Sequence, residues 1–161
     1  MMPSVQTLRT IEEKWMDRLV ALAQEAIEQT GVYGRRCQKH GWFAGEKCPT
    51  CNQNGRPILQ RAQLSNFQNL AAASDSVEVI KLFVRYQMGR REGEGWKFTK
   101  GDAPRFGDQV IEHIDELERW AQEISPSEHK STHLWLIRLY SGFLVRWYVA
   151  LSGGVEEERE E

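Results

Sequence analysis

The chain has 161 residues, which is enough length for one domain with a buried core, and its formal net charge is −2. Its first residues carry charges throughout, unlike a secretory signal peptide, and no apolar run approaches the roughly 18–20 residues that cross a membrane. We therefore expect a soluble, cytoplasmic protein that makes no membrane contact.

Charge is distributed unevenly along the chain. From Arg35 to Arg105 there are 13 Lys and Arg against 6 Asp and Glu, a balance of +7, whereas the remainder has 8 against 17, a balance of −9. A basic segment between acidic flanks favours a face turned toward an anionic partner, and nucleic acid is the commonest such partner. The alternative is ordinary surface charge that happens to cluster.

Apolar residues at three- and four-residue steps predict a first helix from about Val5 to Gln29. Residues 35–57, here called the cysteine module, lack this period and are punctuated by glycine and proline. Four more helices follow, and their predicted ranges are 62–73, 76–91, 106–124 and 130–151.

These elements predict an all-α fold, a helical bundle of about five helices with the cysteine module inserted between helices 1 and 2. Residues 1–154 form a single domain in this interpretation. Residues 155–161 form an acidic tail that is predicted to be disordered.

All three cysteines lie in the module in the pattern Cys37-x-x-His40 … Cys48-x-x-Cys51. Two short pairs allow four ligands to converge on one ion, and Cys₃His is a common set for structural Zn²⁺. Catalytic zinc is disfavoured because four protein ligands leave no open position. Unmetallated cysteines are the remaining alternative. Because so small a module buries little core, zinc binding is expected to be coupled to its folding.

No phosphate-binding glycine loop and no nucleophile arrangement is evident, so an enzyme is not expected. His129 and His133 are four residues apart and are interpreted as surface histidines, with a metal site as the alternative. His113 is interpreted as part of a solvated helix face, with a general base as the alternative.

The segment from Lys81 to Arg105 has the composition of an RNA-binding surface. Its basic side chains are interleaved with Trp96 and Phe98, and such aromatics can stack on bases of single-stranded RNA. Alternatively, both aromatics fold back onto the bundle. The candidate RNA contacts are Lys81, Arg85, Arg90, Arg91, Lys97, Lys100 and Arg105. Arg35, Arg36 and Lys39, which surround the first metal-ligand pair, are possible additional contacts.

The run Ile80–Arg90, with Lys81, Tyr86 and the Gly89–Arg90 ending, resembles a signature helix of the small subunit of type III CRISPR effector complexes. Residues 63–67 resemble the preceding helix opening of that family, and residues 143–148 followed by Gly153–Gly154 resemble its aromatic C-terminal helix. The resemblance covers about residues 60–154. The cysteine module and a long loop at residues 92–104 are additions to the family pattern.

This resemblance implies a non-catalytic, all-helical subunit that contacts guide and target RNA inside a ribonucleoprotein complex with other subunits and further copies of itself. Lys81 and Arg90 are then expected to contact the RNA backbone, and helical spacing adds Arg85. Exposed parts of Trp135 or Trp147 would dock neighbouring subunits. Two alternatives remain: a free-standing, zinc-stabilised helical adaptor that binds protein, and a metal-dependent hydrolase that uses His129 and His133.

Overall fold

The computed structural model describes residues 2–153, so the predicted acidic tail lies outside the described residues. The first helical run comprises α1 (Val5–Thr10), a π-helical turn η1 (Ile11–Trp15) and α2 (Met16–Thr30). The later helices are α3 (Arg61–Ala73), α4 (Val77–Gly89), α5 (Phe106–Ile124), a 3₁₀ turn η2 (Pro126–Glu128) and α6 (His129–Ser152). All five predicted helical segments are therefore confirmed, with ends within a few residues of the expected positions.

Local sequence explains several of these ends. The side chains of Ser4 and Ser76 cap α1 and α4, because each accepts a hydrogen bond from the backbone N–H three residues later. The helix α6 ends at Gly153, whose φ of 71° suits glycine. Pro126 opens the 3₁₀ turn before α6 and separates it from α5.

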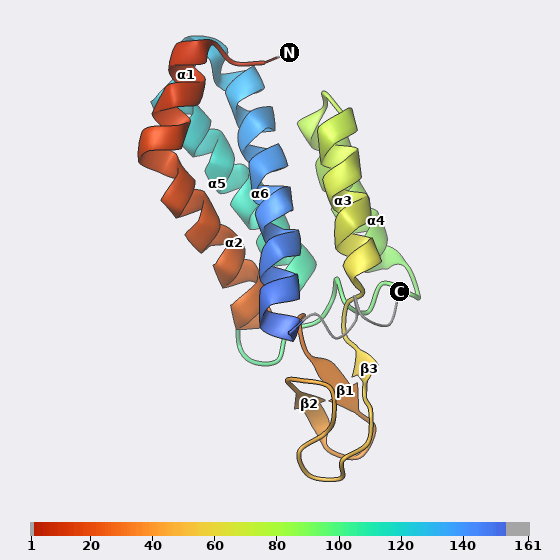
Figure 1. Ribbon diagram of the computed structural model, residues 1–161. Helices are drawn as coiled ribbons and strands as arrows, with labels where there is room; N and C mark the ends of the chain where they lie inside the picture. The colour runs from red at the N-terminus through yellow and green to blue at the C-terminus, as the bar shows by residue number, and fades with distance from the viewer. Residues whose placement is uncertain (1, 154–161) are drawn as a thin grey trace.

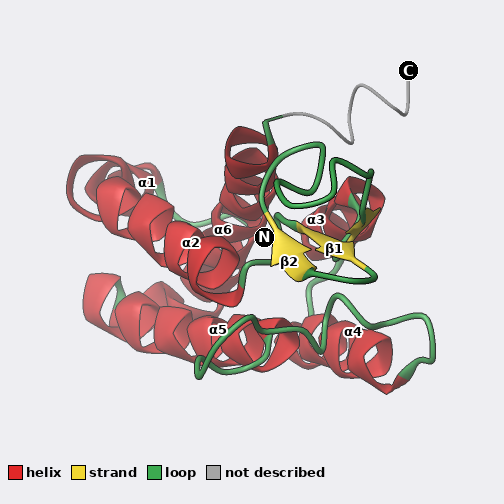
Figure 2. Ribbon diagram, turned by 90° about the horizontal axis from the view of Figure 1, so that it is seen from below, coloured by secondary structure: helices red, strands yellow, loops and turns green. Residues whose placement is uncertain are grey.

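The helix α6 is the centre of the bundle and packs against α2, α3 and α5, while α4 lies against α3 and α5 (Figures 1 and 2). Among the described helices, one stretch, Pro126–Ser152, is apolar enough by length and composition to cross a membrane, with a mean hydropathy of 1.2. No stretch of this kind was expected from the sequence. In the bundle its fully buried Leu136, Ile137 and Leu144 belong to the core, where apolar character is expected.

The cysteine module is not helical but contains a small antiparallel sheet, so the all-α expectation holds for the bundle alone. The strands are β1 (Arg35–Cys37), β2 (Gly41–Phe43) and β3 (Arg56–Pro57), in the order β2-β1-β3. The module projects from one end of the bundle, beside the ends of α2 and α6 and the start of α3 (Figure 1).

Polar contacts fasten the module to the bundle. The indole N–H of Trp42 donates to the carbonyl of Gly31 at 2.8 Å, and the Lys100 ammonium lies 4.4 Å from the Trp42 ring centroid. At the neck, the Tyr148 hydroxyl donates to the carbonyl of Leu59, which leads into α3. The first two contacts join the module to the end of α2 and to the loop after α4, and the third ties α6 to the segment that follows the module.

The two aromatic residues of the loop after α4 fold back onto the bundle. Trp96 is fully buried, and its ring lies 5.2–6.2 Å from the rings of three core phenylalanines, which are Phe67, Phe83 and Phe106. Phe98 is half-buried and packs against the same core. Trp96 is therefore not a base-stacking residue, because a buried ring offers no face to RNA.

Candidate functional site

The four predicted metal ligands converge at the outer end of the module. The Cys37 sulfur lies 3.5 Å from Nδ1 of His40 and 3.6 Å from the Cys51 sulfur, and the Cys48 sulfur lies 3.6 Å from the same Nδ1. All four ligand atoms lie within 4.8 Å of one another, and the three cysteines are free thiols. The cluster is therefore arranged to hold one metal ion.

The three separations of 3.5–3.6 Å match the edges of a tetrahedral zinc site. Zinc bonds of about 2.3 Å to sulfur and about 2.0 Å to nitrogen place neighbouring ligand atoms roughly 3.5–3.8 Å apart. A disulfide would instead require sulfurs about 2.05 Å apart. With four protein ligands around the centre, no coordination position stays open for water or substrate.

The turns of the module prepare the thiols for metal binding. The backbone N–H of Lys39 donates to the Cys37 sulfur and is the main reason that the pKa of Cys37 falls to about 6. The backbone N–H of Cys51 likewise lowers the pKa of Cys48. The backbone N–H of Gln53 acts on Cys51 in the same direction, but burial and the neighbouring thiols outweigh it, so the pKa of Cys51 is raised. At least two thiols are therefore disposed to ionise, as metal ligation requires.

A small core supports the ligands. Phe43 is buried beside Cys37 and Cys48. Gly55 packs so closely on the Phe43 ring that a Cβ at this position would lie 2.5 Å from it, so glycine is needed here. Gly41 has a φ of 79° in the turn that leads from His40 into β2. The glycines that signalled a turn-rich segment thus have identifiable structural roles.

Two of the other histidines, His113 and His133, are buried, so their predicted surface positions were wrong, whereas His129 stays partly exposed. His133 is buried, and its Nε2 lies 2.8 Å from the carbonyl oxygen of Ile114. His113 is also buried, and its Nδ1 lies 2.8 Å from the Tyr140 hydroxyl. Spacing alone missed this because α5 and α6 pack along these positions. His133 is therefore part of a helix–helix contact and does not project beside His129 as a ligand pair.

Burial of His113 predicts a loss of stability in acid. Desolvation lowers the pKa of His113 to about 4, whereas an unfolded histidine titrates near 6.5. Below pH 6.5 His113 is protonated in the unfolded chain but stays neutral in the folded chain. The free energy of unfolding therefore decreases progressively as the pH falls toward 4. At about 1.4 kcal/mol per pKa unit the full cost is about 3 kcal/mol.

Urea unfolding of the native protein and of His113→Gln between pH 7 and pH 4 measures this cost. The variant should lose less stability over the range. The difference between the two proteins isolates His113, because His133, whose pKa burial also lowers, and the metal ligands are present in both. Parallel pH profiles would show that His113 does not carry the effect.

Several predicted RNA contacts are engaged within the protein. Lys81 is 13% exposed and forms an ion pair of 2.7 Å with Asp115, so its charge is already compensated. Arg35 is buried and donates to the carbonyl of Gly55 at 2.8 Å, so it has a structural role in the module and presents little surface to a partner. Lys97 is half-buried and donates to the Arg90 carbonyl. Lys100 over Trp42 and Arg105 with Asp108 also have partners, but both side chains stay exposed.

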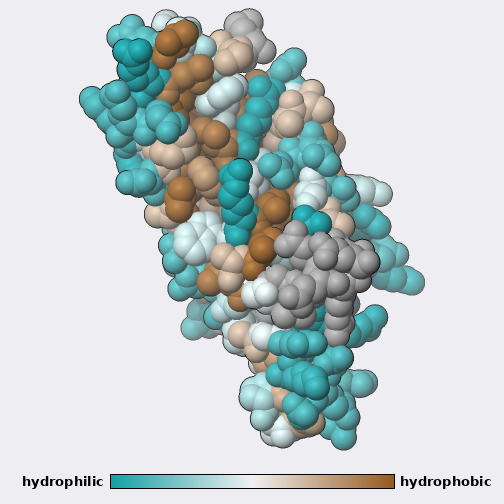
Figure 3. All heavy atoms as spheres, viewed as in Figure 1, coloured by the Kyte–Doolittle hydropathy of each residue, from teal (hydrophilic) through white to brown (hydrophobic). Residues whose placement is uncertain are grey.

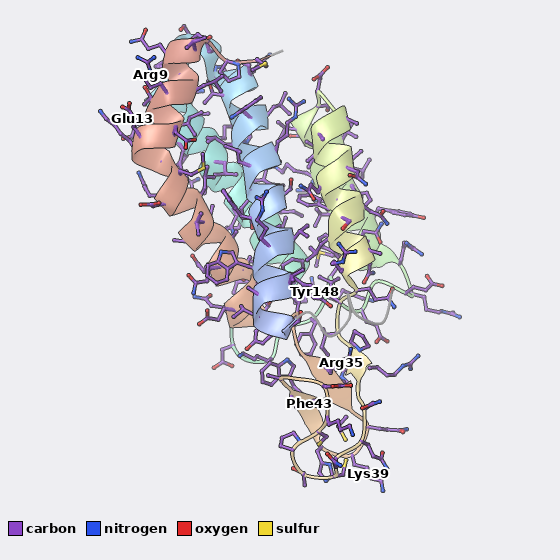
Figure 4. The ribbon with its side chains drawn as sticks, in the orientation of Figure 1. Arg9, Glu13, Arg35, Lys39, Phe43 and Tyr148 are labelled. Carbon is purple, nitrogen blue, oxygen red and sulfur yellow. The ribbon has the colours of Figure 1, made fainter. Side chains whose placement is uncertain are left out.

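A second group of predicted basic residues is accessible. Arg36, Lys39, Arg85 and Arg91 are exposed, and Arg90 is half-exposed with Glu92 at 3.6 Å. Figure 4 shows that Lys39 lies at the far tip of the module and Arg35 at its neck. The surface of this end of the molecule is mainly hydrophilic in the view of Figure 3.

A cleft of about 660 Å³ lies between the module and the end of α4. Its walls carry four arginines, Arg36 and Arg56 from the module and Arg90 and Arg91 from the loop after α4, together with Glu92 and Glu94. We call this feature the arginine cleft. The cleft brings Arg36, one of the basic residues around the first metal-ligand pair, together with Arg90 and Arg91, which follow α4. It also includes Arg56, which was not among the predicted RNA contacts.

Among the described residues, three of the five exposed large hydrophobic side chains are on α4, two are near the N-terminus, and none is on α6. Val79, Leu82 and Tyr86 are 47%, 61% and 62% exposed and follow helical spacing. Trp147 is instead half-buried and donates its indole N–H to the carbonyl of Val20. Trp135 also packs against the core. Tyr86, a residue of the helix that resembles the CRISPR small-subunit signature, is thus an exposed aromatic residue next to Arg85 in the chain.

No protein-family model, no curated protein and no solved structure matches this chain. What the protein does is therefore inferred from the chemistry of the metal cluster and of the basic surface beside it.

Proposed function

We propose that this protein is a non-catalytic small subunit of a type III CRISPR ribonucleoprotein complex, which contacts the RNA backbone and is stabilised by one structural zinc ion. The metal part of the proposal is supported by the Cys₃His donor set, since thiolates favour zinc over magnesium or calcium. The complex is proposed from the sequence resemblance of residues 60–154, and a mostly helical bundle agrees with what that resemblance implies.

The observation that carries the RNA part is a group of uncompensated arginines at one end of the molecule. Arg85 is exposed on α4 next to Tyr86, and Arg36, Arg56 and Arg91 line the arginine cleft nearby. Within residues 2–153, none of these four side chains forms an ion pair with a carboxylate. Such a surface suits phosphate neutralisation with little reading of sequence. Tyr86 is 62% exposed and offers ring surface for stacking beside the Arg90 guanidinium, which lies 5.8 Å from the ring centroid.

Binding of a short single-stranded RNA at several salt concentrations tests the RNA contact. The native protein should lose affinity steeply with salt, with a slope of about −0.7 per neutralised phosphate in a double-logarithmic plot. Arg85→Glu with Arg91→Glu should weaken binding by about 100-fold, because each charge-assisted contact is worth about tenfold. The salt slope should flatten by about 1.4.

Arg9→Glu with Lys14→Glu is the matched control. It changes the charge by the same amount on exposed residues of the first helical run. Arg9 and Glu13, the chain neighbour of Lys14, lie toward the opposite end of the bundle from the module (Figure 4). The control should bind RNA almost as the native protein does. Equal losses of RNA affinity in both double variants would show that only the net charge of the protein matters, and would contradict the proposed interface.

A protein-binding adaptor is the second candidate, and the exposed α4 residues Val79, Leu82 and Tyr86 favour it. In the proposed complex this stripe would contact a neighbouring subunit, which includes a further copy of this chain. As a free-standing adaptor the protein would bind no RNA even at low salt. The titration of the native protein therefore separates the two functions.

A further inference from the structure

The arginine cleft has two walls that come from different parts of the chain. Arg36 on β1 and Arg56 on β3 form the module wall, whereas Arg90 and Arg91 follow the last turn of α4. Phe98 also lines the cleft, and the Arg36 guanidinium is 5.5 Å from its ring centroid. Two glutamates, Glu92 and Glu94, only partly balance the four positive charges.

The two arginines of the module wall stand directly opposite each other. Arg36 and Arg56 are register partners in the antiparallel pair of β1 and β3, so their side chains leave the same face of the sheet. Like charges in this position repel and destabilise the strand pair. Both side chains are exposed and neither has a carboxylate partner in the described part of the chain. An anion between them would turn this repulsion into attraction.

The size and lining of the cleft narrow the class of anion. Its volume of about 660 Å³ is within the range of small-molecule sites and exceeds what a single inorganic ion needs. Guanidinium groups bind phosphate through paired hydrogen bonds. The Arg36–Phe98 pair adds a flat surface against which a base can stack. A ligand that carries both a phosphate and a planar base is a nucleotide.

We propose that the arginine cleft binds one phosphate-bearing nucleotide unit, either as a residue of an RNA strand or as a free nucleotide, and that the metal ion is required for this binding. The RNA form of the proposal rests on the proposed function. The phosphate is placed between Arg36 and Arg56. Metal is required because β1 ends at the ligand Cys37 and β3 follows shortly after the ligand Cys51, so the ion holds both strands in place.

Arg56→Gln is the most informative variant, because it should change stability and binding in opposite directions. Removal of one of two repelling charges should leave the metal content at one ion per chain and keep or raise the melting temperature. Affinity for a short single-stranded RNA should fall by about tenfold. Removal of the metal by chelation from the native protein should lower the affinity at least as far, and added zinc should restore it.

Arg9→Gln is the matched control, since it removes one exposed arginine far from the cleft (Figure 4). A second binding series uses a nucleoside monophosphate in place of RNA. Saturable binding that Arg56→Gln weakens would identify the free nucleotide as a ligand. If Arg56→Gln weakens RNA binding but the nucleoside monophosphate does not bind, the ligand of the cleft is a nucleotide within an RNA strand.

The failures of the two proposals are distinguishable. RNA binding that Arg85→Glu with Arg91→Glu reduces, but that Arg56→Gln and chelation leave unchanged, overturns the cleft inference and keeps the proposed function. Nucleotide binding that depends on Arg56, with no RNA binding at low salt, keeps the cleft and overturns the RNA proposal. A lower melting temperature for Arg56→Gln would contradict the repulsion between the two arginines.

Discussion

Cys48→Ser should abolish stoichiometric zinc binding and unfold the cysteine module, while the helical bundle remains folded. Cys48 is almost fully buried in the small core of the module, and its pKa is lowered by the backbone N–H of Cys51. A serine hydroxyl is a poor zinc ligand, so three ligands remain and the tetrahedral set is lost. The apparent binding energy of structural zinc, about 10–16 kcal/mol, is largely folding energy in such modules.

The bundle should survive because its core is separate from that of the module. The module core consists of Phe43 and the cysteines, whereas the bundle core joins residues of all the helices from α2 to α6. Elemental analysis should find one zinc per chain in the native protein and a marked loss in the variant. Amide hydrogen exchange should accelerate throughout residues 35–57, while helical circular dichroism stays close to that of the native protein.

Thr50→Ala provides the matched control, because Thr50 is exposed between Cys48 and Cys51 and offers no ligand atom to the cluster. This variant should retain zinc and native exchange rates. Full zinc content in Cys48→Ser would show that the four side chains do not act as one site. Loss of bundle helicity together with the module would show that the two cores fold as one unit.

Trp96→Ala should destabilise the bundle by about 3–5 kcal/mol, the range for large aromatic truncations in a core. Trp96 is fully buried, and its ring contacts those of Phe67, Phe83 and Phe106. These residues belong to α3, α4 and the start of α5, so one cavity would loosen three helices. Urea unfolding monitored by circular dichroism measures the change.

Tyr86→Ala is the contrasting variant, because Tyr86 is 62% exposed. Its stability should change by less than about 0.5 kcal/mol, as for ordinary surface substitutions. Its RNA affinity should fall, since the exposed Tyr86 ring, with Arg85 next to it in the chain and the Arg90 guanidinium 5.8 Å from its centroid, is the proposed stacking surface. A small stability loss for Trp96→Ala combined with a large RNA effect would reverse this assignment and restore Trp96 as the base-stacking residue.

The elements that depend on local sequence were predicted well. The helices follow apolar periodicity, and their ends follow serine caps, proline and glycine, all of which act within a few residues. The metal ligands were also predictable, because two short ligand pairs within one small module can reach a common centre without help from the bundle. The small sheet was not predicted, since its strands are only two or three residues long.

Local sequence patterns therefore sufficed to predict the helical segments, the position of the module and the four residues that could hold a metal ion. Which basic and aromatic residues are accessible depends instead on packing between distant segments. Lys81 is held by Asp115, Arg35 by the Gly55 carbonyl, and Trp96 is buried, whereas Tyr86 is exposed. The physical reason is that charge compensation and burial depend on partners far along the chain, 34 residues away for Lys81. The arginine cleft has the same origin, because packing alone brings Arg36 and Arg56 to face Arg90 and Arg91.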